Sequence, residues 1–183
     1  MIILIGGAGS VGKTRLAQTI LERYRITYLS ADHLKMGLYR GWEDCGFTPL
    51  SSDSLIADSL WPVIRGIVET NIENGQRLTV EGCYLPQRKV TALLKRYPHE
   101  IRAVYLILSE GYVRRHFQDG ILAYRNVIES RGYAEERTVE QLVDENTEQK
   151  RLCLESDLPY LEIQEDYERE LDAVFTLLGL AEG

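Results

Sequence analysis

Short apolar runs alternate along this chain with longer stretches of helical pattern. The short runs are continuously apolar rather than alternating, which is typical of strands buried on both faces of a parallel sheet. The expected strands are Ile2–Ile5, Ile26–Leu29, Leu78–Val80, Ala103–Leu108 and Tyr160–Ile163; the expected helices are Lys13–Tyr24, Asp32–Tyr39, Leu55–Glu73, Gln87–Arg96, Glu110–Phe117, Thr138–Leu154 and Tyr167–Leu178. Strand–helix alternation of this kind predicts one α/β domain with a doubly wound sheet and right-handed crossovers.

Two polar segments interrupt this rhythm. The first lies between Phe117 and Thr138 and contains glycines, acids and several arginines. It is interpreted either as a partly ordered excursion over the sheet edge or as a mobile lid. The second runs from Gly41 to Asp53. Neither segment reads as a linker that would divide the chain.

Residues 7–14 read GAGSVGKT and match the complete GxxxxGK[ST] pattern of a phosphate-binding loop. This phosphate loop follows an expected strand directly and opens into an expected helix, which is the context that the pattern requires. Lys13 would place its charge on the β- and γ-phosphates of a nucleotide, and the Thr14 hydroxyl would bind Mg²⁺. The backbone N–H groups expected to face the phosphates belong to Gly7, Ala8, Gly9, Ser10, Val11 and Gly12. The alternative is a glycine-rich turn that only joins a strand to a helix, and the full pattern in this context argues against it.

Two acids follow expected strands at the edge where open α/β sheets bind ligands. Glu81 comes after the third strand and is the candidate for holding the hydration shell of Mg²⁺. Asp32 comes after the second strand and is the candidate for orienting, and even deprotonating, an acceptor hydroxyl. A structural alternative for Asp32 is the N-cap of the helix that follows, and the two roles are compatible.

Four arginines fall within 18 residues of an otherwise acidic chain: Arg114, Arg115, Arg125 and Arg131. Phosphoryl transfer needs cations that neutralise the moving group, so Arg114 and Arg131 are candidates for catalysis, and Arg115 and Arg125 for nucleotide binding. The alternative is a solvated face linked by salt bridges. Lys35, Arg40, Arg65 and Arg88 are further candidates for meeting an anionic acceptor.

The overall charge argues against polyanionic partners. The net charge is −7, from 28 acidic and 21 basic residues, which disfavours binding to nucleic acid or to an anionic membrane. Cys45, Cys83 and Cys153 show neither disulfide nor zinc spacing, so packing roles are expected. The apolar run at the N-terminus is too short for a signal peptide, and no run approaches the ~20 residues of a membrane span. We therefore expect a cytoplasmic protein. A monomer and a homodimer both stay open.

With GAGSVGKT, SADHLKMGLYRG, VEGCYLP and the arginines after YLILSE, the chain resembles the small-molecule kinases of the adenylate-kinase-like P-loop group. Within that group it looks most like the short bacterial proteins described as 2-phosphoglycerate kinase-like or adenylate kinase-like. The resemblance implies a five-stranded parallel sheet ordered 2-3-1-4-5, an acceptor-binding region at about 32–70 and an arginine-bearing lid at about 118–137. It also places Asp32 where shikimate, gluconate and antibiotic kinases carry their acceptor aspartate. Adenylate kinases have Asp-Gly-Phe-Pro-Arg where this chain has EGCYL, so the resemblance does not extend to AMP specificity.

The expected function is an ATP- and Mg²⁺-dependent kinase that transfers the γ-phosphoryl group to a small, anionic metabolite, such as 2-phosphoglycerate or a nucleotide-like compound. Two alternatives stay open. One is a nucleotide-sensing module with slow or absent turnover. The other is a toxin- or resistance-type kinase that acts on a nucleotide sugar or a drug hydroxyl. The chain lacks the Asn-Lys-x-Asp signature of GTPases and the Leu-Ser-Gly-Gly-Gln run of transporter ATPases.

Overall fold

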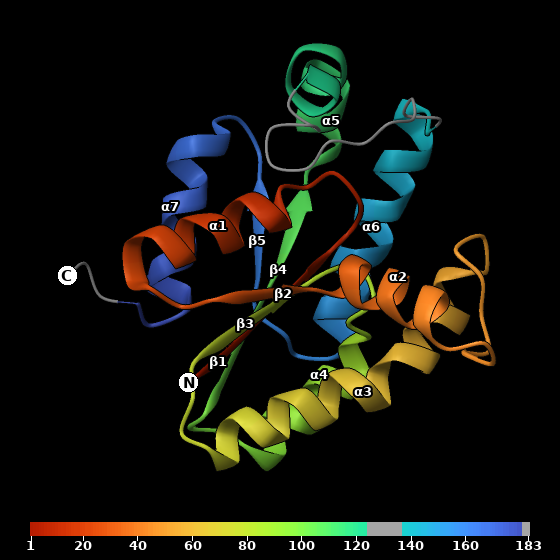
Figure 1. The fold of residues 1–183 in the computed structure, drawn as a ribbon. Coiled ribbons are helices and arrows are strands. Elements are labelled where there is room, and N and C mark those ends of the chain that lie inside the picture. Colours follow the sequence, from red (N-terminus) through yellow and green to blue (C-terminus); the bar gives the residue numbers. More distant parts are fainter. Residues whose placement is uncertain (124–136, 181–183) are drawn as a thin grey trace.

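The computed structural model describes residues 1–123 and 137–180. Its strands are β1 (Ile2–Gly7), β2 (Tyr28–Ser30), β3 (Leu78–Glu81), β4 (Ile101–Leu108) and β5 (Tyr160–Ile163), and they form one parallel sheet in the order β2-β3-β1-β4-β5 (Figure 1). The helical segments are α1 (Lys13–Tyr24), α2 (Ala31–Gly41), α3 (Asp53–Glu73), α4 (Gln87–Arg96), α5 (Glu110–His116), the π-helical η1 (Phe117–Leu122), α6 (Val139–Glu155) and α7 (Tyr167–Leu177). The predicted fold class and strand order are confirmed.

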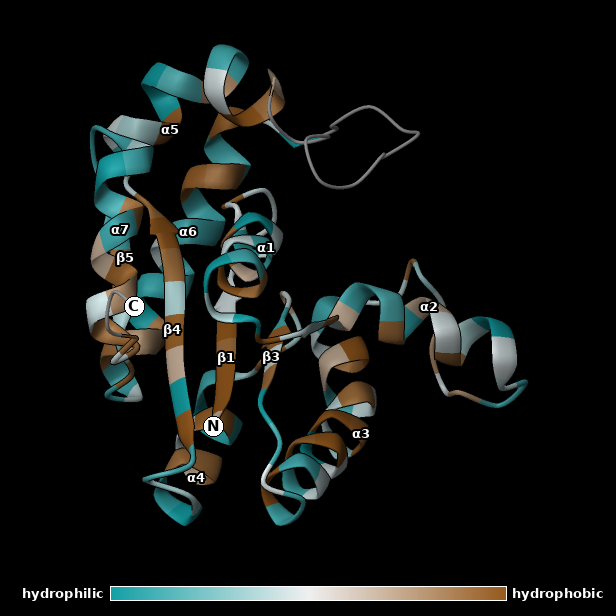
Figure 2. Ribbon diagram, turned by 60° about the vertical axis from the view of Figure 1, so that its left-hand side comes forward, coloured by the Kyte–Doolittle hydropathy of each residue, from teal (hydrophilic) through white to brown (hydrophobic). Residues whose placement is uncertain are grey.

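The helices cover both faces of the sheet. On β1, Ile3 and Ile5 belong to a core that includes side chains of α1 and α7, whereas Ile2 and Leu4 belong to a second core that includes side chains of α3 and α4. Figure 2 shows the hydrophobic colour concentrated on β1 and β4, the strands between these two layers. This two-sided burial is the physical reason for the continuous apolar runs in the sequence.

The boundaries of two helices, Lys13–Tyr24 and Gln87–Arg96, match the prediction to the residue. The second strand does not: it begins at Tyr28, not at Ile26. Arg25 adopts a left-handed conformation (φ 55°) that ends α1, and Ile26 is fully buried before the strand begins. The apolar run therefore includes a core residue of the connection as well as the strand.

Buried Asn146 fixes α6 against the end of β4. Its Oδ1 atom accepts a hydrogen bond from the Leu108 backbone N–H at 2.8 Å, and its Nδ2 atom donates to the Leu142 carbonyl at 2.8 Å. The helix begins with a capping box, in which Thr138 and Gln141 bond each other's backbone. These contacts hold the start of α6 near the carboxyl edge of the sheet. Among the helices in residues 1–123 and 137–180, none is long and apolar enough to cross a membrane.

Candidate nucleotide and acceptor site

The phosphate loop connects β1 to α1, as predicted, and its glycines are sterically required at two positions. Gly12 has a φ of 86°, and a Cβ atom there would lie 1.7 Å from the hydroxyl oxygen of Tyr167. Gly7 has a φ of 133°, and a Cβ atom there would lie 2.4 Å from the carbonyl oxygen of Leu106. A residue with a side chain would be strained by the positive φ and would collide with these neighbouring atoms. Glycine at both positions therefore lets the backbone lie close to β4 and α7.

Lys13 lies across this loop with only 6% of its surface exposed. Its ammonium group donates to the Ala8 carbonyl at 2.5 Å and to the Cys83 sulfur at 3.3 Å. Cys83 belongs to the turn after β3, and the sequence predicts only a packing role for it. The structure instead places its thiol beside the loop lysine.

The phosphate loop is braced by two residues from distant parts of the chain. The Tyr167 hydroxyl, at the start of α7, donates to the Val11 carbonyl at 3.0 Å. The Arg137 guanidinium, just before α6, donates to the Ser10 hydroxyl at 2.9 Å and forms an ion pair with Glu145 at 2.9 Å.

Arg137 lies so close to the loop that a Cβ atom at Gly9 would lie 2.3 Å from its Nη1 atom. It is therefore a cation at the phosphate loop that the sequence analysis did not single out. The Thr138–Gln141 capping box marks the start of α6 in the sequence, but it does not indicate that the residue before it lies beside the phosphate loop.

Thr14 and Glu81 are the residues whose side-chain oxygen atoms the sequence predicts for Mg²⁺. Thr14 is in the first turn of α1, and Glu81 is the last residue of β3, with 2% of its surface exposed. In the sheet, Glu81 lies opposite Ile5 of β1 and Ser30 of β2. A hydroxyl and a carboxyl group are ligands that suit Mg²⁺ held mainly by nucleotide phosphates. The described ranges contain no group of three or more His, Cys, Asp or Glu side chains arranged to hold a metal.

On the acceptor side, Asp32, Lys35 and Tyr84 form a hydrogen-bonded cluster. The Lys35 ammonium lies 2.9 Å from Asp32 Oδ1 and 2.9 Å from the Tyr84 hydroxyl, and the Lys35 side chain is only 13% exposed. Burial acts to lower the pKa of Lys35, but the hydrogen bonds with Tyr84 and Asp32 outweigh it and hold that pKa above its usual range. Lys35 is therefore a charged donor at neutral pH, next to the carboxylate proposed to meet the acceptor.

The N-cap interpretation of Asp32 is wrong, because α2 begins earlier than predicted and its N-cap residue is Ser30. Asp32 lies inside the first turn, where its carboxylate is paired with Lys35. Close approach of Gly82 to α2 brings the two segments together: a Cβ atom at Gly82 would lie 2.5 Å from the Cβ atom of Ala31.

Of the four predicted arginines, the structure describes Arg114 and Arg115. Arg114 pairs with Glu110 at 2.9 Å and with Glu140 at 3.2 Å. These ion pairs match the alternative to phosphate binding, a solvated face linked by salt bridges. Arg115 donates to the Gln164 carbonyl at 2.7 Å and so joins α5 to the loop after β5. Arg125, Arg131 and most of the predicted lid at 118–137 lie outside the described residues.

Comparison with known proteins shows similarity in structure only. No family model matches the chain, and no curated protein matches its sequence. Among solved structures, a tunicamycin resistance protein of Deinococcus radiodurans superposes with a TM-score of 0.60 at 18% identity, over 98% of this chain and 96% of that one. A shikimate kinase of Bacteroides thetaiotaomicron gives 0.54 at 18% identity, over 98% of each chain. A sugar kinase of a Janibacter species gives 0.54 at 17% identity, over 99% and 95%.

These matches define the class of fold. The chain has the fold of the P-loop small-molecule kinases, with the phosphate loop in the strand–loop–helix position that the sequence predicts. At this level of identity the likeness concerns architecture, so the activity has to be argued from the site itself.

Proposed function

We propose that this protein is an ATP-dependent kinase that transfers a γ-phosphoryl group to a hydroxyl of a small, anionic metabolite. One observation carries the proposal. Two consecutive residues, Cys83 and Tyr84, contact the phosphate-loop lysine and the acceptor-side lysine respectively. The turn after β3 thus lies beside both the phosphate-loop lysine and the lysine that pairs with Asp32, which supports a nucleotide and an acceptor bound on either side of this turn.

The roles follow from charge and reach. The loop N–H groups, Lys13 and Arg137 stabilise negative charge on the transferring group. Asp32 orients the acceptor hydroxyl and takes its proton as the new P–O bond forms; the bond from the γ-phosphorus to the β–γ bridging oxygen breaks, and ADP leaves with the electron pair. When bound through Thr14 and Glu81, Mg²⁺ would neutralise phosphate charge.

The proposed preference for an anionic acceptor rests on Lys35. An ammonium group has three donors, and two are directed at Asp32 and Tyr84. The third donor of Lys35 has no partner among the described residues, and an acceptor carboxylate or phosphate would use it. An acceptor of the 2-phosphoglycerate or nucleotide type would meet this demand.

A screen with γ-labelled ATP and Mg²⁺ tests the proposal, using sugar acids, hydroxy acids, phosphorylated three-carbon acids and nucleoside-type hydroxyl compounds. We expect label on at least one acceptor, and a fall of several orders of magnitude with Lys13→Ala. Lys95→Ala, an exposed change on α4, should leave the rate unchanged. ATP binding without transfer to any acceptor would instead favour a sensing module, and transfer only to a drug or nucleotide sugar would favour a resistance-type kinase.

A further inference from the structure

The hydroxyl of Ser30, at the end of β2, is a buried polar group without a hydrogen bond. Ser30 is only 3% exposed, and its Oγ atom has no partner among the described residues. A buried hydroxyl normally has a partner, because leaving it unpaired costs the free energy of removing it from water. This hydroxyl therefore calls for an explanation in terms of function.

Ser30 does not fill the structural role that its position offers. It is the N-cap residue of α2, where serine is preferred because its oxygen can accept a hydrogen bond from a backbone N–H of the first turn. Ser52 and Ser109 accept such bonds at the starts of α3 and α5. The side chain of Ser30 makes no capping bond. The hydroxyl thus contributes nothing to the start of α2.

The register of the sheet places Ser30 next to a predicted Mg²⁺ ligand. Ser30 pairs with Glu81 of β3, and Glu81 pairs with Ile5 of β1. Paired residues on neighbouring strands point to the same face of a sheet. Ile5 packs in the core that includes side chains of α1, the helix that carries Thr14 in its first turn. Ser30 and Glu81 therefore lie on the face that α1 covers, at the carboxyl ends of their strands.

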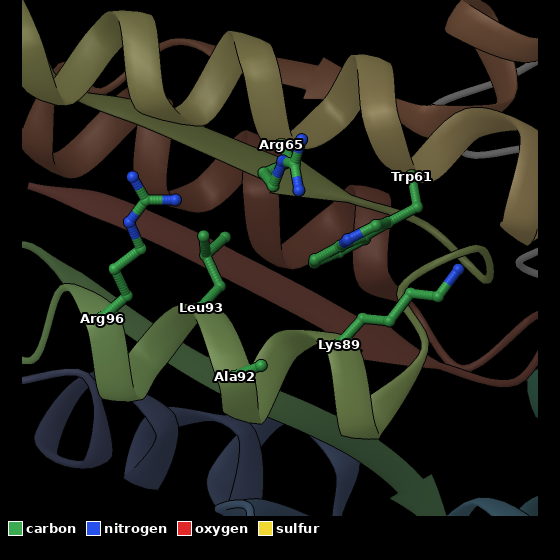
Figure 3. A pocket seen from close by; sticks show the side chains of 6 residues that line it. All are labelled: Trp61, Arg65, Lys89, Ala92, Leu93 and Arg96. Atoms are coloured by element: carbon green, nitrogen blue, oxygen red, sulfur yellow. The ribbon is translucent and has the colours of Figure 1, made fainter.

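The polar groups of the hollow between α3 and α4 differ from Ser30, because they lie at the surface and have partners (Figure 3). Lys89 pairs with Asp58 at 2.5 Å. Arg96 pairs with Glu69 at 2.9 Å. The buried hydroxyl thus directs attention to the end of β2 and not to this hollow.

We propose that Ser30 is a positioning residue for Mg²⁺, whose hydroxyl holds a water of the Mg²⁺ hydration shell when Mg·ATP is bound. Mg²⁺ keeps several of its waters in nucleotide sites, and a hydroxyl can accept a hydrogen bond from one of them while donating another. Groups that hold such waters orient the cation and add to its affinity. The inference rests on the proposed function, because that function brings Mg·ATP to the phosphate loop.

The test compares nucleotide binding with and without Mg²⁺, so it needs no phosphoryl transfer. Calorimetry with a non-hydrolysable ATP analogue gives one dissociation constant in Mg²⁺ and one in EDTA, and their ratio is the gain from Mg²⁺. We expect Ser30→Ala to reduce this gain about three- to tenfold and to leave the constant in EDTA unchanged. Ser30→Gly also lacks the hydroxyl and should give the same loss.

The free energy of unfolding without ligand separates this role from a structural one. Ser30→Ala removes a buried hydroxyl that has no partner, so the free energy of unfolding in urea should stay the same or rise. Ser52→Ala is the matched control, since it removes a hydroxyl that caps α3. It should lower the free energy of unfolding and leave the gain from Mg²⁺ unchanged.

Three results would refute the role of Ser30. They are a full gain from Mg²⁺ in Ser30→Ala, an equal loss of binding in Mg²⁺ and in EDTA, and a loss of stability like that of Ser52→Ala. Each of them leaves the proposed function standing as long as the wild type gains affinity from Mg²⁺. A wild type that binds the nucleotide no better with Mg²⁺ than without it would contradict both the role of Ser30 and the proposed function.

Discussion

At the scale of single residues, the site depends on the pair Cys83 and Tyr84. The Cys83 sulfur accepts a hydrogen bond from the Lys13 ammonium at 3.3 Å. The Tyr84 hydroxyl oxygen accepts one from the Lys35 ammonium at 2.9 Å. The centroid of the Tyr84 ring lies 5.0 Å from that ammonium, which approaches the ring from its hydroxyl end. Lys35 in turn pairs with Asp32, so the position of the Asp32 carboxylate is set by residues of both α2 and the turn after β3.

Asp32→Asn removes the charge of the carboxylate and keeps the size of the side chain. The amide keeps an oxygen that can accept from Lys35 but cannot take the acceptor proton. We expect the transfer rate to fall by about 10²–10⁴-fold, while the dissociation constant for Mg·ATP changes little, because the described Asp32 carboxylate pairs with Lys35 and makes no hydrogen bond or ion pair with residues 7–14. Steady-state rates with the acceptor from the screen, and calorimetry with a non-hydrolysable ATP analogue, measure the two effects.

Asp172→Asn is the matched control for this change, since Asp172 is an exposed carboxylate on α7 paired with Arg23. It should leave both quantities unchanged. If Asp32→Asn weakened nucleotide binding as much as it slowed transfer, Asp32 would serve the nucleotide side of the site and not the acceptor.

At the scale of elements, α7 organises the loop after β5. The Glu170 carboxylate accepts hydrogen bonds from the backbone N–H groups of Gln164, Glu165 and Asp166 at 2.8, 2.7 and 2.8 Å. Arg115 of α5 donates to the carbonyl of the first of these residues. The loop is thus fixed by two helices, next to the phosphate loop that Tyr167 contacts.

Glu170→Gln should destabilise the protein in a pH-dependent way. Burial acts to raise the pKa of Glu170, but the three N–H groups outweigh it and hold that pKa below its usual range. The unfolded state therefore binds the proton more readily, so the stabilisation is present above the unfolded pKa and is lost as the pH falls through the folded one.

We expect Glu170→Gln to lower the free energy of unfolding by about 1 kcal/mol at pH 7, and the difference from the wild type to shrink as the pH falls below about 4. Urea unfolding of the wild type and of Glu170→Gln across this pH range measures the difference in their free energies of unfolding. Glu165→Gln, an exposed neighbour whose side chain caps nothing, should show no such dependence. A constant difference at all pH values would mean that the Glu170 charge is not what holds the loop.

The elements also show what the sequence can predict. Positions 7–14 are recognisable because the phosphate loop needs glycines, a lysine and a hydroxyl at fixed spacing, and all of these demands are local. The bounds of α1 and α4 follow from equally local patterns. The start of β2 was misplaced because Ile26 is buried in the core without pairing in the sheet, and apolar character alone does not distinguish the two.

At the scale of the whole molecule, the phosphate loop is held by parts of the chain that lie far away in sequence. Arg137 contacts Ser10 across 127 positions, and Tyr167 contacts Val11 across 156. No local pattern encodes such pairs, because they depend on how α6 and α7 pack against the sheet. The same holds for Cys83, whose place beside Lys13 follows from the pairing of β3 with β1.

Because these braces join the phosphate loop to several elements, nucleotide binding should stabilise the molecule as a whole. A ligand at 100 times its dissociation constant adds about 2.7 kcal/mol to the free energy of unfolding, and in a chain of 183 residues this raises Tm by roughly 5–10 °C. Thermal unfolding with and without Mg·ATP measures the shift, and Lys13→Ala should abolish most of it while Lys95→Ala keeps it. Since Lys13 is buried and bonded within the loop, the comparison rests on the shift in each variant and not on its Tm without ligand. An equal shift in Lys13→Ala would place the nucleotide elsewhere on the molecule and remove the phosphate loop from the proposed mechanism.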